Sequence, residues 1–230
     1  MILLAALAVA AGALVQGITG IGFSLVSAPF LIALLGPHDG VRISLVLGSG
    51  LNVVLLAAEH RRVRMGEAAL LFVPAAIATP LVALAVKDAD PGPLALAGGL
   101  LTIVAALAVA RGRFSNLRGR GGAVVAGAIS GAMNVTAAIG GPAAALYAIS
   151  AGWPPADMRA TLQAYFLALN IVAALTIGIV MPGVSLVVAM VAGLTLGLVL
   201  RGRVSPDAAR RATLVLAVIG GGAAIVRGLA

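Results

Sequence analysis

Polar residues that could bind an anion are concentrated in two glycine-rich segments, 16–24 and 134–141. Glycine allows a sharp bend, and a helix that restarts after a bend presents free backbone N–H groups and the positive end of its dipole to an anion. Amide and hydroxyl side chains nearby add donors. We therefore expect both segments to form helix ends that bind an anion. The candidates are Gln16, Thr19, Gly20, Gly22, Ser24, Asn134, Thr136, Gly140 and Gly141.

The long apolar stretches that follow carry the remaining candidates. Arg42 and Arg159 each come shortly after a glycine-rich segment, where a guanidinium could attract an anion to the mouth of a site or could snorkel to lipid headgroups. Asn52 and Asn170 lie near the middle of their stretches, where they could contact a ligand or hold helices together by hydrogen bonds. Gln163 and Tyr165 lie between Arg159 and Asn170 and could add donors. These alternatives stay open.

The composition indicates a protein that lies almost entirely inside a lipid bilayer. Hydrophobic residues make up 62% of the chain, charged residues 10%, and the mean hydropathy is +1.17. An ordinary soluble domain is about 45–50% apolar and about 25% charged. The net charge of +8 comes from basic residues in short breaks between apolar stretches, and aromatic residues are only 3%, so nucleic-acid binding is not expected. Without cysteine and with two histidines, we expect no metal site and no cofactor.

The chain divides into apolar stretches of membrane-spanning length and two shorter, bent regions. Since a spanning helix needs about 20 mostly apolar residues, we expect helices over 41–58, 66–86, 91–110, 156–181, 182–200 and 208–226. Regions 1–36 and 121–152 each contain a glycine-rich break. We expect each to be a hairpin of two short helices, because bare backbone at membrane depth must be buried in protein or face a water-filled cavity. The alternative is a pair of ordinary helices that pack tightly through small residues.

The two halves of the chain repeat the same order of elements. Each has a glycine-rich hairpin, then an arginine, a helix with an asparagine near its middle, and two further helices. We therefore expect two membrane repeats, residues 1–110 and 121–230, joined by a basic linker at 111–120. The matched pairs are Pro29 with Pro142, Arg42 with Arg159, Asn52 with Asn170, Met65 with Met181, and Pro91 with Pro206.

Equivalent breaks in the two halves carry opposite charge bias. The break at 61–64 is basic, whereas its counterpart at 181–183 is uncharged; the break at 87–90 is mainly acidic, whereas its counterpart at 201–211 is basic. Because cytoplasmic loops are enriched in Lys and Arg, this pattern predicts that the halves lie inverted in the membrane, with both termini outside. A hairpin plus three spans also gives an odd number of crossings. Inverted repeats are typical of secondary transporters, with the substrate site where discontinuous helices meet.

The glycine-rich signatures resemble those of the TauE/SafE sulfite exporter family. The first is Gly12-Ala13-Leu14-Val15-Gln16-Gly17-Ile18-Thr19-Gly20-Ile21-Gly22 leading to Pro29, and the second is Gly127-Ala128-Ile129-Ser130-Gly131 leading to Gly140-Gly141-Pro142 and then Arg159. The resemblance covers essentially the whole chain. It implies a bacterial or archaeal transporter in the cytoplasmic membrane that moves small sulfur-containing anions, driven by an ion gradient.

Together these features predict an all-helical, polytopic membrane protein of two inverted repeats. Its expected function is secondary transport of small anions, such as sulfite or organosulfonates, across the cytoplasmic membrane by alternating access. The expected partners are the anion, the lipid bilayer and a coupling ion, H⁺ or Na⁺; a homo-oligomer is left open. No arrangement of residues suits an enzyme. The alternatives are an anion channel of the same architecture and a membrane subunit that does not transport.

Overall fold

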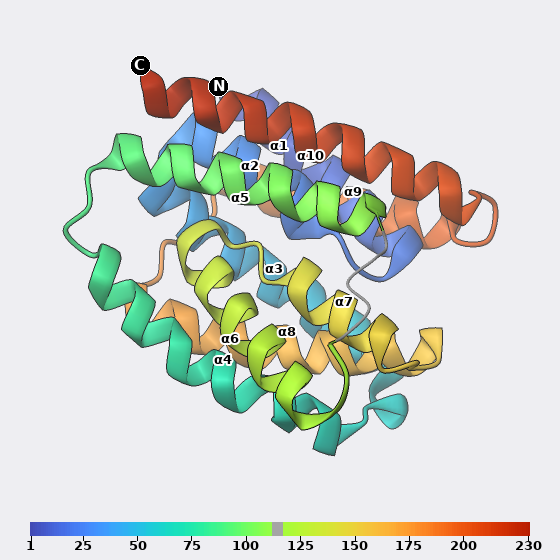
Figure 1. Cartoon of the computed structure of the whole chain (residues 1–230). Helices are drawn as coiled ribbons and strands as arrows, with labels where there is room; N and C mark the ends of the chain where they lie inside the picture. The colour runs from blue at the N-terminus through green and yellow to red at the C-terminus, as the bar shows by residue number, and fades with distance from the viewer. Residues whose placement is uncertain (112–116) are drawn as a thin grey trace.

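The chain folds into a bundle of helices, as predicted (Figure 1). The computed structural model describes residues 1–111 and 117–230, and this described part contains helices and no strand. Six of the helices are long and apolar enough to cross a membrane. The elements are α1 (Ile2–Thr19), α2 (Phe23–Leu35), α3 (Pro37–Glu59), the 3₁₀ turn η1 (His60–Arg62), α4 (Met65–Val86), α5 (Pro91–Arg111), α6 (Gly119–Ala137), α7 (Gly141–Ser150), α8 (Pro155–Ile177), α9 (Val184–Leu200) and α10 (Pro206–Leu229).

The helix boundaries follow turn chemistry that hydropathy alone does not reveal. The prediction of one helix over 156–181 and the next over 182–200 is wrong at the junction, because α8 ends at Ile177 and α9 begins at Val184. Gly178 caps α8 in a conformation with φ of +88°, which favours glycine and stops the helix there. The expected linker at 111–120 is shorter at both ends, since α5 includes Arg111 and α6 begins at Gly119. Arg113 of that linker lies outside the described residues.

Each glycine-rich region is a hairpin of two helices, but the arms are unequal. In the first hairpin α1 has 18 residues and α2 has 13; in the second α6 has 19 and α7 has 10. The expectation of two short arms is therefore wrong for the leading arm. At 1.5 Å per residue α1 is about 27 Å long, enough for a nearly complete crossing.

The two breaks correspond, although not through the prolines. Pro29 lies inside α2, whereas Pro142 lies in the first turn of α7, so the predicted match between them is wrong. Instead, Gly20 and Ala138 have the same role: each ends the leading arm of its hairpin in the left-handed conformation, with φ of +85° and +56°. They are 118 residues apart, the same offset that joins Asn52 to Asn170.

The leading arm of each hairpin packs against a helix of the other half of the sequence. Helix α1 packs on α9, and α6 packs on α4. Both crossings are close because of glycines: a Cβ at Gly193 would overlap the Ala10 carbonyl, and a Cβ at Gly131 would overlap the Ala75 carbonyl. Small residues at such crossings are typical of membrane helices.

Two further helix pairs run antiparallel. In the pair α3–α8, Arg159 near the start of α8 lies beside Glu59 at the end of α3. In the pair α5–α10, Gly99 faces Gly221 and Gly92 faces Gly228, so the start of one helix meets the end of the other. Figure 1 shows α5 and α10 side by side along one face, with α4 and α6 toward the opposite face.

Within the described part of the chain, the buried side chains form three core clusters. Two of these clusters each combine three helices from one half of the sequence with one helix from the other half. One core cluster joins α1, α2 and α3 with α9, and another joins α6, α7 and α8 with α4. A third cluster packs α5 and α10 against α2, α3 and the second break. Large apolar side chains on the outside, such as Val73, Ile77 and Leu81 of α4, are more than half exposed, as a lipid-facing surface requires.

Candidate functional site

Gln16, just before the first break, holds four helices together. Its Oε1 accepts a hydrogen bond from the backbone N–H of Phe23 (2.9 Å), the first residue of α2. Its Nε2 lies 3.4 Å from Asn52 Oδ1 on α3 and 3.4 Å from Gln163 Oε1 on α8. Gln163 in turn donates to the carbonyl of Gly20. We call Gln16, Asn52, Gln163 and Gly20 the first polar cluster; its three amide side chains are buried.

A second polar cluster lies at the second break and consists of Asn134, Asn170, Ser130 and Gly140. Asn134 Nδ2 donates to Asn170 Oδ1 at 3.0 Å, which joins α6 to α8. The Ser130 hydroxyl donates to the carbonyl of Gly140 at 2.7 Å, directly before α7 begins. Gly48 of α3 lies close by, since a Cβ there would be 3.3 Å from Asn170 Nδ2.

The hydrogen bonds of the two clusters match between the halves. Gln16 pairs with Asn52 and Asn134 pairs with Asn170, and each pair spans 36 residues. Both members shift by 118 residues from the first pair to the second. The structure thus places Asn52 and Asn170 in interhelical hydrogen bonds, one of the two interpretations left open by the sequence.

The two clusters lie close to one another along α8. Gln163 and Asn170 are seven residues apart, which corresponds to about 10 Å along the helix. Gly48 and Asn52, which face these clusters from α3, are one turn apart. The broken helices and the middle of the α3–α8 pair therefore form one polar layer inside an otherwise apolar bundle.

One end of the α3–α8 pair, which we call the Glu59 end, is closed by ion pairs. Arg159 Nε lies 3.7 Å from Glu59 Oε1, and Arg201 Nη1 lies 3.4 Å from the same oxygen. The aliphatic part of Arg159 packs over Gly20, where a Cβ would overlap its Cδ atom. Arg159 thus lies directly against the first polar cluster, one helical turn from Gln163.

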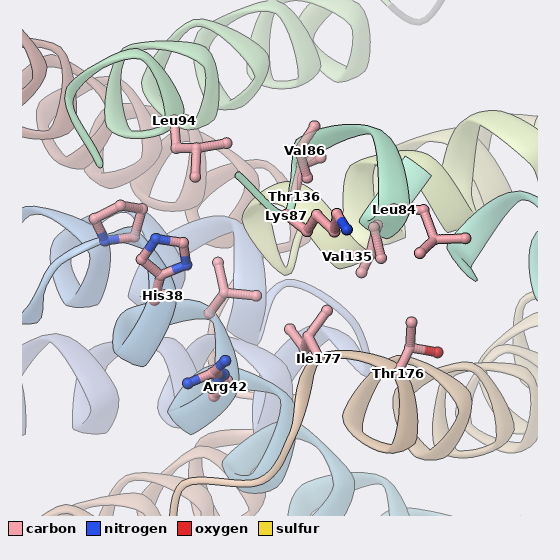
Figure 2. A pocket seen from close by; sticks show the side chains of 13 residues that line it. His38, Arg42, Leu84, Val86, Lys87, Leu94, Val135, Thr136, Thr176 and Ile177 are labelled. Carbon is pink, nitrogen blue, oxygen red and sulfur yellow. The ribbon is translucent and has the colours of Figure 1, made fainter. Parts of the chain in front are cut away.

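The opposite end, which we call the Arg42 end, contains a cavity of about 290 Å³ (Figure 2). His38, Arg42 and Lys87 line it together with the hydroxyl-bearing Thr136 and Thr176. No carboxylate is among its lining residues, although Arg42 has Asp39 at 3.9 Å and Lys87 has Asp88 at 3.7 Å. The rest of the lining is apolar: Pro37, Val41, Ala83, Leu84, Val86, Leu94, Val135 and Ile177. The cavity therefore combines positive charge with an apolar wall.

The other predicted residues stay close to the breaks without joining the polar clusters. The Thr19 hydroxyl donates to the Val15 carbonyl (2.9 Å) and accepts from the Ile21 N–H (3.3 Å), so it stabilises the bend itself. Gly22 is the N-cap of α2, with φ of +124°, and Ser24 is half-buried in the next turn. Gly141 is the first residue of α7, and Thr136 bonds to its own helix through the Ala132 carbonyl (2.8 Å) and lines the cavity.

Several residues of these regions were not predicted from the sequence. They are Glu59, His38, Lys87, Thr176 and Ser130. Glu59 looked like an ordinary residue at a segment end. The antiparallel packing of α3 on α8 brings it to Arg159, and the inverted repeat expected from the charge pattern could have indicated this.

Basic residues gather at the Glu59 end. The helices that end there are α3, α5, α7 and α9, and those that begin there are α4, α6, α8 and α10. The basic residues outnumber the four acidic residues of that end, whereas at the Arg42 end Asp39, Asp88 and Asp90 balance the few basic residues. The basic residues of the Glu59 end are Arg61, Arg62, Arg64, Arg111, Arg118, Arg120, Arg159, Arg201, Arg203, Arg210 and Arg211.

The chain matches the model of one known protein family. The family model described as "Sulfite exporter TauE/SafE" matches residues 4–224, nearly the whole chain. Searches of curated proteins and of solved structures found no match.

Proposed function

The chain belongs to the TauE/SafE sulfite exporter family, a family of multi-pass membrane transporters and not of enzymes, and from this premise we propose what it carries and how. We propose that the protein is a secondary transporter for small sulfur oxyanions, sulfite or organosulfonates, in the cytoplasmic membrane. The observation that carries this proposal is the polar layer at the helix breaks, with an arginine toward each end. Polar residues at membrane depth are rare, and where they gather they usually mark a substrate or ion pathway.

The proposed substrate site lies between the two breaks. The N-termini of α2 and α7 meet the polar layer, and helix N-termini favour anions through free N–H groups and the helix dipole. The amides of the first and second polar clusters supply donors that can rearrange toward an anion. Arg159 and Arg42 would then attract the anion from the two ends. The amide hydrogen bonds would be the closed arrangement of the empty site.

The packing supports an inverted repeat, with residues 1–110 and 121–230 as the two units. Helices α3 and α8 are counterparts in the repeat and run antiparallel, as do α5 and α10. The basic Glu59 end would face the cytoplasm by the positive-inside rule, and both termini would then be outside. The reciprocal crossings α1–α9 and α4–α6 fit the same arrangement.

The two ends differ as alternating access requires. The Arg42 end holds a basic cavity, whereas the Glu59 end is closed by ion pairs. We propose that the moving bodies are the two packed groups, α1–α3 with α9 and α6–α8 with α4, rather than the two halves of the sequence. Domain rocking around a fixed midplane site is the general behaviour of inverted-repeat transporters.

Flux through the purified protein in liposomes tests the proposal. We expect uptake of sulfite or sulfoacetate driven by an imposed H⁺ or Na⁺ gradient. Arg159→Gln should lower the rate at least about tenfold, because a charge-assisted contact to the anion is lost. Arg203→Gln, an exposed arginine of the same end, is the matched control and should keep wild-type flux.

Two results would contradict the proposal in different ways. Absence of sulfur-anion flux from folded wild-type protein would remove the substrate assignment. Flux that follows voltage alone, without coupling to either ion, would favour the anion channel over the carrier.

A further inference from the structure

The Glu59 carboxylate lies between two arginines and does not satisfy all of their hydrogen-bond donors. Its carboxylate is the last group of α3, and its Oε1 lies between Arg159 Nε (3.7 Å) and Arg201 Nη1 (3.4 Å). The side chain is only 20% exposed. The Nε of Arg159 is buried and has no hydrogen-bond partner within the described part of the chain. The contact between Glu59 and Arg159 is thus an ion pair without a hydrogen bond.

The helix dipoles of α3 and α8 destabilise the charges of Glu59 and Arg159 unless each has an opposite charge nearby. A carboxylate at the C-terminus of a helix and a guanidinium near the N-terminus of another are each at the unfavourable end of the dipole. Glu59 and Arg159 occupy such positions on α3 and α8. Each therefore needs an opposite charge nearby, and for Arg159 any suitably placed anion would serve in place of Glu59.

An oxyanion could satisfy the two arginines better than Glu59 does. Arginine donates through a planar fork, and short charge-assisted hydrogen bonds are stronger than contacts of 3.4 to 3.7 Å. A pyramidal or tetrahedral oxyanion presents several oxygens in different directions and can accept from both guanidinium groups at once. Its place would be against Gly20 and the first polar cluster, which Arg159 already contacts.

We propose that Glu59 is a resident counter-ion, which occupies Arg159 and Arg201 while the site is empty and is displaced by the substrate anion. This inference rests on the proposed function and deepens it. Displacement frees the end of α3 from α8 and α9, so binding of the anion and opening of the Glu59 end become one event. Competition with the carboxylate also selects against weakly bound monoanions such as chloride. Glu59 is thus a positioning residue that acts through Arg159.

The fluorescence of Trp153, the only tryptophan of the chain, can report sulfite binding. Trp153 is buried at the Glu59 end, with the Arg64 guanidinium 5.6 Å from its ring centroid. Its fluorescence is recorded while sodium sulfite is added to purified protein, with sodium chloride at equal ionic strength as the reference. Liposome flux on the same variants gives KM and maximal rate.

We expect the Glu59→Gln variant to bind sulfite at least about fivefold more tightly than wild type, because the competing charge is removed while size is kept. Its KM should fall by a similar factor. Glu59→Asp keeps the charge but shortens the reach, so its affinity should lie between the two. Glu67→Gln is the matched control, since Glu67 also pairs with an arginine at this end (Arg64, 3.7 Å) and should leave the affinity unchanged.

The possible results distinguish failure of the counter-ion role of Glu59 from failure of the proposed transport function. Equal or weaker sulfite binding by Glu59→Gln, with normal flux in wild type, overturns the counter-ion role and leaves the transporter standing. If Glu59→Gln does not fold, Glu59→Asp decides, and wild-type affinity in that variant overturns the role. Absence of a sulfite-dependent signal and of flux in every variant overturns both proposals.

Discussion

Single residues show why the two helix breaks are alike in geometry and unlike in sequence. Gly20 and Ala138 both adopt the left-handed conformation that ends a leading arm, yet only the first is glycine. Asn134 likewise takes the place of Gln16. Matching by residue type therefore aligned Pro29 with Pro142 and missed both pairs. The sequence singled out the amides that the structure buries, but not most of the buried hydroxyls, and the partners of the amides depend on which helices pack together.

The Gly20→Ala variant should lose stability and transport together. An alanine with φ near +85° costs about 1–2 kcal/mol, and its Cβ would also displace the side chain of Arg159. We expect a lower thermal unfolding midpoint in detergent and a lower flux in liposomes. An unchanged midpoint would mean that the break can relax without cost.

At the second break, the reverse substitution, Ala138→Gly, should raise the stability of the protein. Ala138→Gly relieves the left-handed strain but gives the unfolded chain more freedom, so we expect a net gain in stability of up to about 1 kcal/mol. The same thermal unfolding measurement checks it. A clear decrease in the midpoint would show that the methyl group of Ala138, which is buried, contributes more by packing than its backbone costs.

Whole elements were predictable where they are long and apolar, and less so where they are short. Hydropathy predicted both hairpins and five of the six candidate spans, because a run of about 20 apolar residues has few other structures. It missed α1, which is long enough to span, and it counted as a span the 17-residue α9, which is shorter than the other spans. It could not give the unequal arms, since the lengths of α2 and α7 depend on where each fits beneath its neighbours. Nor could it give the crossings α1–α9 and α4–α6, which small residues on both helices make close.

Glycine-to-alanine substitutions should separate crossing glycines from lipid-facing ones. Gly193→Ala and Gly131→Ala put a methyl group into the backbone of the partner helix, so we expect each to lower the thermal midpoint clearly. At Gly222 of α10 a Cβ meets nothing within 4 Å, and Gly222→Ala should raise stability by about 0.5–1 kcal/mol through helix propensity. Equal effects at all three positions would contradict the crossing geometry.

The molecule as a whole is polarised between its two ends. At the Glu59 end arginines outnumber the acidic residues, whereas at the Arg42 end, where the basic cavity lies, acidic and basic residues are balanced. This polarity was visible in the sequence as the charge bias of alternate breaks. The exchange of α4 and α9 between the packed groups was not, because no local pattern specifies which distant helix covers a given face.

Labelling of single cysteines tests the proposed inversion. The chain has no native cysteine, so one can be introduced at a time. We expect Asp88→Cys and Met181→Cys to react with an impermeant thiol reagent from outside intact cells, and Arg61→Cys and Gly202→Cys only after permeabilisation. All four native side chains or backbone positions are exposed. Reaction of Asp88→Cys and Met181→Cys from opposite sides would contradict the inverted repeat.

The crossing of α1 with α9 also means that α1 must wait for its packing partner while the chain is being synthesised. Ala10 meets Gly193, so α1 is covered by a helix that is synthesised about 180 residues later. At about 5–20 residues per second, α1 waits on the order of 10–40 s in the bilayer with its contact face bare. A ribosome that stalls before α9 leaves a fragment whose first helix stays uncovered.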